Sequence, residues 1–150
     1  MKILAVVDGS ERTGRIVKWL LDLPLKREAI EVVLLNIQPK PQEWRMRGYG
    51  WFQREAIHDR LINDLGARIA GSAARHLKAA GIAHRSRVVL GDVAEIIVRC
   101  TEEENCDLVV VPQPKPGIIR RWLMRAARLT IGSDASAVVH SVQVPVVLVR

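Results

Sequence analysis

The sequence predicts a doubly wound α/β domain, in which helices cover both faces of a parallel sheet. Two observations predict this fold. Short apolar runs of strand length recur along the chain, and amphipathic helical patterns alternate with them. Parallel strands need crossover connections, and right-handed crossovers place helices against both faces. The 150 residues, 49% apolar and 26% charged, have the size and composition of one globular domain, expected to span residues 1–150.

The first quarter of the chain holds two of these apolar runs. "KILAVV" at residues 2–7 is apolar after its lysine and ends at an Asp-Gly-Ser turn signal, which is typical of a strand buried on both faces. Residues 11–23 repeat apolar side chains on one helical face before Pro24. "IEVVLLNI" at residues 30–37 is the second buried strand. The pattern therefore opens as strand, helix, strand.

A long helix is predicted over residues 52–80. Every fourth residue of this segment is apolar and forms one stripe: Ile57, Leu61, Leu65, Ile69, Ala73 and Leu77. Gly81 is well placed to end the helix. "HRSRVVLG" at residues 84–91 predicts a third strand, and its polar start favours a position near the edge of the sheet.

The remaining segments predict one more strand between helices and then a final strand. Asp92 can cap a helix whose apolar residues follow helical spacing. "DLVVV" at residues 107–111 predicts the fourth strand, residues 134–141 a short helix, and "VPVVLVR" at residues 144–150 the last strand.

Charge and cysteine content narrow the classes of function. A net charge of +7 with a pI of about 10.1 favours an anionic partner without selecting among nucleotide, nucleic acid and acidic membrane. The apolar run before Asp8 is too short for a signal peptide or a membrane span, so a cytoplasmic location is expected. Cys100 and Cys106 are then expected to be reduced and packed.

No catalytic pattern is found in the sequence. It has no G-x-S-x-G, no G-x-G-x-x-G and no Walker A loop. The four histidines show no metal-ligand spacing. We therefore expect a protein that is not an enzyme, with no catalytic residue and no metal site.

Three stretches resemble the universal stress protein family, and the resemblance covers nearly the whole chain. They are "ILAVVDGSE" at the start, "GDVAEIIVRCTEEENCDLVVV" in the middle and "GSDASAVVHSVQVPVVLVR" at the end. The resemblance implies a Rossmann-like, five-stranded parallel sheet of order 3-2-1-4-5 and a dimer. In the nucleotide-binding branch of the family, a glycine motif after the fourth strand wraps the phosphates of ATP, and an aspartate closing the first strand contacts the adenine side.

The resemblance implies a set of binding residues in this chain. Asp8 matches the aspartate, Ile37 matches an apolar residue beside the base, and Gly132 and Ser133 match the end of the glycine motif. Val111 ends the fourth strand and completes the apolar part of the candidate site.

The first half of the glycine motif is missing. Its two glycines fall on Pro112 and Lys115, and the spacing to Gly132 is too long. Pro112, Pro114 and Pro116 each lack a backbone N–H, so three donors are lost from the phosphate loop. Lys115 could supply a point charge in their place.

Several features admit two interpretations. Asp8 could contact a ligand or form an Asx turn, and Gly132-Ser133 could bind an anion or only cap a helix. The basic segment from Ile118 to Ile131 favours a covering helix over one that binds acidic lipid or nucleic acid. The aromatic loop from Trp44 to Phe52 favours a lid over a base-stacking or partner-binding surface.

Together these features indicate a stress-response binding or signalling module that does not hold ATP tightly and acts through an unidentified protein partner. The alternative is an adenine-nucleotide (ATP or AMP) binder with a remodelled phosphate loop, possessing at most slow hydrolysis. The last strand is apolar and sits at a sheet edge in the order that the resemblance implies. We therefore expect a homodimer joined through Val144, Val146 and Leu148.

Overall fold

The computed structural model describes residues 1–38, 60–112 and 142–150, and its centre is a parallel five-stranded sheet. The strand order is β3-β2-β1-β4-β5, which confirms the order expected from the resemblance. Neighbouring strands pair in parallel throughout. The strands are β1 (Lys2–Val6), β2 (Glu31–Gln38), β3 (Ala83–Leu90), β4 (Leu108–Pro112) and β5 (Val146–Val149).

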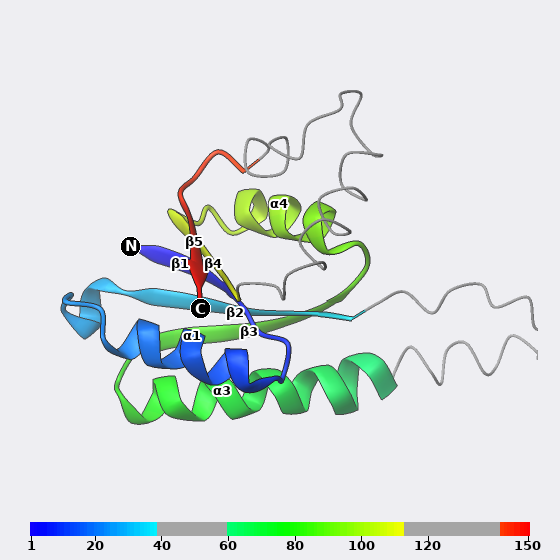
Figure 1. Ribbon diagram of the computed structural model, residues 1–150, viewed down its shortest axis with the longest axis horizontal. Helices are drawn as coiled ribbons and strands as arrows, with labels where there is room; N and C mark the ends of the chain where they lie inside the picture. The colour runs from blue at the N-terminus through cyan, green and yellow to red at the C-terminus, as the bar shows by residue number, and fades with distance from the viewer. Residues whose placement is uncertain (39–59, 113–141) are drawn as a thin grey trace, which may run out of the picture.

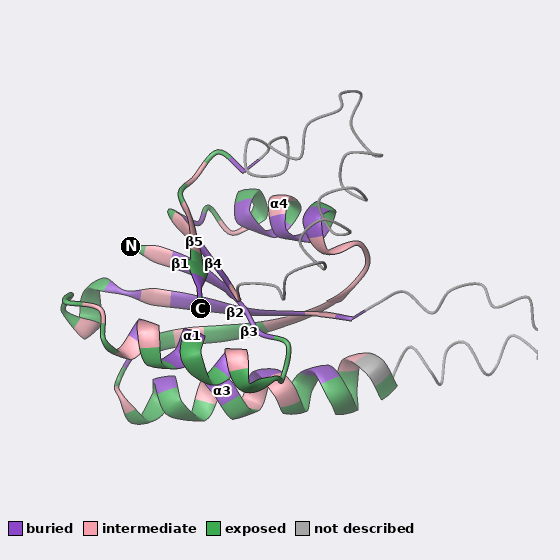
Figure 2. Cartoon of the chain, viewed as in Figure 1, coloured by how far each residue is buried: buried purple, intermediate pink, exposed green. Residues whose placement is uncertain are grey.

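Helices cover both faces of this sheet. Helices α1 (Glu11–Leu21) and α3 (Ala67–Ala79) lie together on one face, and α4 (Val93–Glu103) lies on the other (Figure 1). A short 3₁₀ turn, η1 (Arg27–Ala29), leads into β2. Two apolar layers result. Figure 2 shows buried residues, in purple, on the helix faces turned toward the sheet.

Strand β2 shows how the sequence builds these two layers. Because side chains alternate across a strand, Val32 and Leu34 join the layer under α1 and α3, whereas Val33 and Leu35 join the layer under α4. All four side chains are fully buried. This explains why the run is apolar throughout and does not alternate with polar residues.

The predicted helix ends are confirmed where glycine and aspartate signal them. Gly81 has φ +70°, and the backbone N–H of Ile82 donates to the carbonyl of Leu77 at 3.0 Å, which closes α3 in a left-handed cap. Asp92 caps α4, because its carboxylate accepts hydrogen bonds from the backbone N–H groups of Ala94 and Glu95.

The long second helix differs from its prediction. Residues Arg60–Gly66 form a π-helix, η2, before the regular helix α3 begins. A π-helix bonds residue i to i+5, so a spacing of four no longer returns to the same face. Leu65, predicted to lie on the buried stripe, is 47% exposed, while Ala73 and Leu77 are buried. The predicted start of this helix at residues 52–59 and the predicted helix at 134–141 lie outside the described residues.

The edges of the sheet agree with the sequence pattern. β3 is an edge strand, as its polar start predicted, and β5 forms the other edge.

Cys100 and Cys106 are both buried free thiols, as expected. Across residues 1–38, 60–112 and 142–150, the helices are too short or too polar to cross a membrane.

Gly9 allows β1 to turn into α1 close to α3. Its φ is +76°, a conformation that costs a residue with a Cβ roughly 1–2 kcal/mol. A Cβ added at Gly9 would also lie 2.8 Å from Cγ1 of Ile69. The close approach of this turn to α3 therefore depends on glycine.

We predict that Gly9→Ala lowers the free energy of unfolding by about 2 kcal/mol or more, because it combines backbone strain with a clash against Ile69. Gly71→Ala is the control, since nothing lies within 4 Å of a Cβ added at this position inside α3. We expect it to be neutral or to stabilise the protein by about 0.5–1 kcal/mol. Urea unfolding checks both, and equal stability of the two variants would contradict the role given to Gly9.

Candidate functional site

The carboxyl ends of β1 and β4 mark the point where the direction of strand order reverses. From β1 the chain proceeds to β2 and β3 on one side, and β4 and β5 lie on the other side. The connecting helices consequently lie on opposite faces of the sheet. Ligands of doubly wound folds bind in the crevice at such a switch point.

Asp8 lies directly beyond β1 at this switch point, and both of its carboxylate oxygens are hydrogen-bonded. Oδ1 accepts hydrogen bonds from the backbone N–H of Ser10 at 3.0 Å and its hydroxyl at 2.6 Å, and from the hydroxyl of Thr13 at 3.2 Å. Oδ2 pairs with Nη2 of Arg12 at 2.8 Å. The Asx turn proposed for Asp8 is thus confirmed. The carboxylate is held in one orientation, yet its side chain is 33% exposed.

These contacts decide the charge state of Asp8. Partial burial by itself raises the pKa of the Asp8 carboxyl. Hydrogen bonds from the Ser10 hydroxyl and backbone, the charge of Arg12 and the Thr13 hydroxyl outweigh burial and lower the pKa below its ordinary value. Asp8 is therefore an anionic acceptor at neutral pH.

The backbone N–H groups around Asp8 are used within the protein. The Thr13 hydroxyl oxygen accepts from the backbone N–H groups of Asp8 at 3.1 Å and Gly9 at 3.0 Å. The Ser10 hydroxyl caps the N–H of Arg12 at 3.3 Å. The start of α1 is thereby capped by its own side chains, with these donors already committed.

An apolar surface adjoins Asp8 on the α4 face of the sheet. Ile37 pairs in register with Val89, and both are half-buried against the layer that contains Val111. The pairing of Val6 with Leu35 places Ile37 across from Asp8 as the strands continue. The structure thus gathers three predicted site residues, Asp8, Ile37 and Val111, at the ends of adjacent strands.

Two buried amides support this edge from the opposite face. The side-chain amide of Asn36 donates to the carbonyl of Val7 at 2.7 Å, and that of Gln38 donates to Oδ1 of Asn36 at 2.6 Å. Asn36 is 1% exposed and Gln38 7%. Sequence reasoning missed this pair, although two polar residues closing an apolar strand were a visible signal. The amides fix the carbonyl that directly precedes Asp8.

Pro112 ends β4 beside Val149 and is half-buried. Because proline has no backbone N–H, the last position of this strand offers no donor. The other predicted site residues, Lys115, Gly132 and Ser133, lie outside the described residues, as do the basic segment and the aromatic loop.

Within the described parts of the chain, no group of three metal-ligating side chains is present. Burial raises the pKa of both the Cys100 and the Cys106 thiols, which disfavours the reactive thiolate.

The lowered pKa of Asp8 predicts a pH dependence of stability. A carboxyl whose pKa is lower in the folded state stabilises the fold above its unfolded value of 3.8, and this contribution is lost as the pH falls through the folded pKa. Asp8→Asn should therefore be less stable than the wild type at pH 7, and the difference should shrink below about pH 4. Urea unfolding at both pH values checks this, and a constant difference would contradict it.

Comparisons with known proteins agree with this fold. A model of the universal stress protein family matches residues 1–150. Similar solved structures include a universal stress protein family protein from Burkholderia pseudomallei, with 21% identity and a TM-score of 0.67 over 99% of this chain and 94% of that one. A family protein from Arabidopsis thaliana with AMP bound has 14% identity and a TM-score of 0.61 over 99% and 90% of the two chains.

The universal stress protein from Archaeoglobus fulgidus in complex with dAMP has 13% identity and a TM-score of 0.57, over 100% of this chain and 98% of that one. A comparison with curated protein sequences gives no match. At these identities the solved structures establish the fold alone. The family model spans the whole sequence, and the chain therefore belongs to the universal stress protein family.

Proposed function

We propose that this universal stress protein is a stress-response binding module without catalytic activity, whose switch point takes the nucleoside part of an adenine nucleotide and holds its phosphates weakly. The observation that carries the proposal is the oriented carboxylate of Asp8 beside the apolar surface of Ile37 and Val89.

The chemistry of this surface suits a nucleoside. An ionised carboxylate accepts hydrogen bonds from ribose hydroxyls or from an exocyclic amine, and charge-assisted bonds of this kind are the stronger ones. The half-buried side chains of Ile37 and Val89 offer an apolar surface on which a base ring can lie. Adenine nucleotides in two of the similar structures, AMP and dAMP, support adenine as the base.

The described residues of the same edge offer few donors for phosphate. At the start of α1, the N–H groups of Asp8, Gly9 and Ser10 already donate to side chains of the turn. At the start of α4, Asp92 occupies the N–H groups that could attract an anion. Pro112 has no N–H at the end of β4. These features support weak retention of the triphosphate.

Titration calorimetry with adenosine tests the role of Asp8. We expect Asp8→Asn to weaken adenosine binding about tenfold or more, because it removes the charged acceptor. Asp22→Asn is the matched control, since Asp22 is an exposed C-cap at the far end of α1. That control should bind as the wild type does.

We expect the wild type to bind ATP with a Kd of roughly 0.1 mM or weaker and to release no phosphate from it. Thermal unfolding of both variants shows whether a loss of binding reflects a loss of fold. Equal binding by Asp8→Asn and the wild type, or low-micromolar ATP affinity, would refute the assignment.

We also propose a homodimer joined through β5. Within the described residues this strand pairs with β4 alone, and its Leu148 residue is 57% exposed. Within the expected dimer strand, Val144 and Val146 are half-buried. An exposed apolar edge strand invites pairing with a second chain. Pairing two copies would cover Leu148 and extend the sheet.

A charge at this edge should separate the subunits. We expect Leu148→Glu to give a monomer in light scattering at micromolar concentration, since the charge cannot be buried unpaired in an apolar interface. Leu25→Glu is the control, because Leu25 is 43% exposed on the connection between α1 and β2. It should leave the dimer intact, and a wild-type monomer would exclude the dimer.

A further inference from the structure

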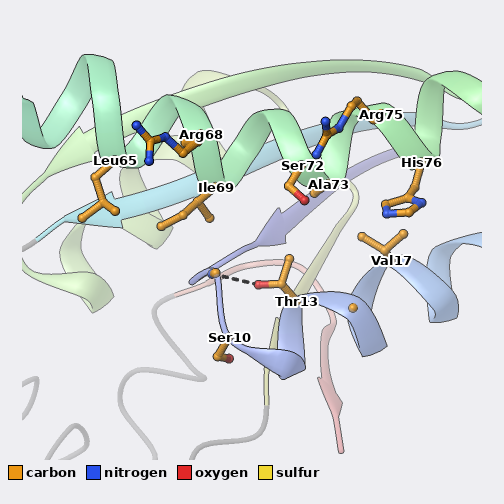
Figure 3. Close-up of a pocket in the computed structure, with 12 residues that line it drawn as sticks. Ser10, Thr13, Val17, Leu65, Arg68, Ile69, Ser72, Ala73, Arg75 and His76 are labelled. Atoms are coloured by element: carbon orange, nitrogen blue, oxygen red, sulfur yellow. Dashed lines mark hydrogen bonds between the residues drawn. The ribbon is translucent and has the colours of Figure 1, made fainter.

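A groove runs between α1 and α3, on the sheet face opposite α4. Its volume is about 430 Å³, within the usual range of small-molecule sites. Figure 3 shows Ser72, Ala73 and His76 of α3 facing Thr13 and Val17 of α1. The apolar surface beside Asp8 lies on the other face, formed by Ile37 and Val89. The groove begins at Gly9, Ser10 and Thr13 of the Asp8 turn and runs along α1 and α3 away from that apolar surface, so it is a second, adjoining candidate site.

Two positive charges line this groove, on Arg68 and Arg75. Among the described residues that line it there is no carboxylate. Arg68, Ser72 and Arg75 follow helical i, i+4, i+7 spacing, so they lie along one face of α3. The two arginines are separated by about 10 Å along the helix axis.

The described arginines divide into four that pair with a described carboxylate and others, among them Arg15 and Arg27 as well as Arg68 and Arg75, that do not. Within the described residues, four arginines form ion pairs with carboxylates: Arg12, Arg85, Arg87 and Arg99. No carboxylate of that same part lies within ion-pair distance of Arg68 or Arg75. An anion in the groove would give both guanidinium groups an opposite charge to pair with.

The shape and donors of the groove define the class of anion. Its floor is apolar, with Ile69 and Val17 at the base, while guanidinium and hydroxyl donors stand along the α3 side. Phosphate accepts several such hydrogen bonds at once, and guanidinium matches its geometry. We infer that the groove binds a small molecule with two or more phosphate groups, which Arg68 and Arg75 hold at separate points.

Calorimetry with sodium tripolyphosphate on the full chain tests this inference. We expect binding that weakens as salt rises, because exposed charges are screened. The double variant Arg68→Gln/Arg75→Gln should lose about tenfold or more in affinity. The matched control Arg15→Gln/Lys18→Gln removes two charges from exposed positions of α1 that do not line the groove. It should change affinity by less than about threefold.

A third variant distinguishes binding inside the groove from non-specific electrostatic attraction of a polyanion to the basic protein. Gly14 lines the groove, and nothing lies within 4 Å of a Cβ added there. Gly14→Gln should block binding by filling the groove without changing the net charge. Citrate, an organic polyanion without phosphate, should bind at least about tenfold more weakly than tripolyphosphate.

Four results would overturn the inference. They are the absence of tripolyphosphate binding at low salt, an equal loss in the two double variants, unchanged affinity in Gly14→Gln, or citrate binding as tightly as tripolyphosphate. Adenosine binding should be unaffected by the arginine variants. Failure of the groove is thus distinguishable from failure of the nucleoside site.

Discussion

The turn from β1 into α1 is the constraint on which the rest of the site depends. The Asp8 carboxylate, the Ser10 and Thr13 side chains and the backbone N–H groups of the turn bind one another. Gly9 provides the left-handed backbone that brings this turn against Ile69 of α3. From behind, Asn36 holds the carbonyl of Val7. The position of α1 relative to the sheet, and hence the shape of both candidate sites, follows from this network.

The hydrogen bonds that build the turn also determine which polar groups remain available to a ligand at this edge. Donors at the starts of α1 and α4 are used by Asp8, Ser10 and Asp92, so the described residues of this edge provide an acceptor and an apolar surface but few donors. Arg68 and Arg75 provide cationic donors along the groove between α1 and α3. A nucleoside suits the first environment and a polyphosphate suits the second. The proposed nucleoside site and the proposed polyphosphate groove would thus use different surfaces of the molecule.

Most of the fold could be predicted from the sequence because its signals are local. Apolar runs marked the strands, Gly81 and Asp92 marked helix ends, and the polar start of the third strand marked an edge. Asp8, Ile37 and Val111 were predicted as site residues from the family resemblance, which also supplied the strand order; the structure places them at the ends of adjacent strands.

Other features depend on contacts that sequence spacing does not contain. The π-helix at Arg60–Gly66 places Leu65 on the exposed side of the helix. Apolar spacing in the sequence does not predict this, because it cannot distinguish i+4 from i+5 hydrogen bonding. The amide pair of Asn36 and Gln38 and the groove between α1 and α3 arise only when segments distant in sequence are packed together.

The most direct test of a nucleoside site that holds phosphates weakly is a methyl NMR titration of Ile37 and Val89 with adenosine and with ATP. The account predicts that both ligands shift these methyl signals. It also predicts that the Kd for ATP read from them lies within about threefold of that for adenosine, since each tenfold difference would require about 1.4 kcal/mol from the phosphates. ATP binding more than about tenfold tighter than adenosine at these methyl groups, or adenosine leaving them unshifted, would contradict the account.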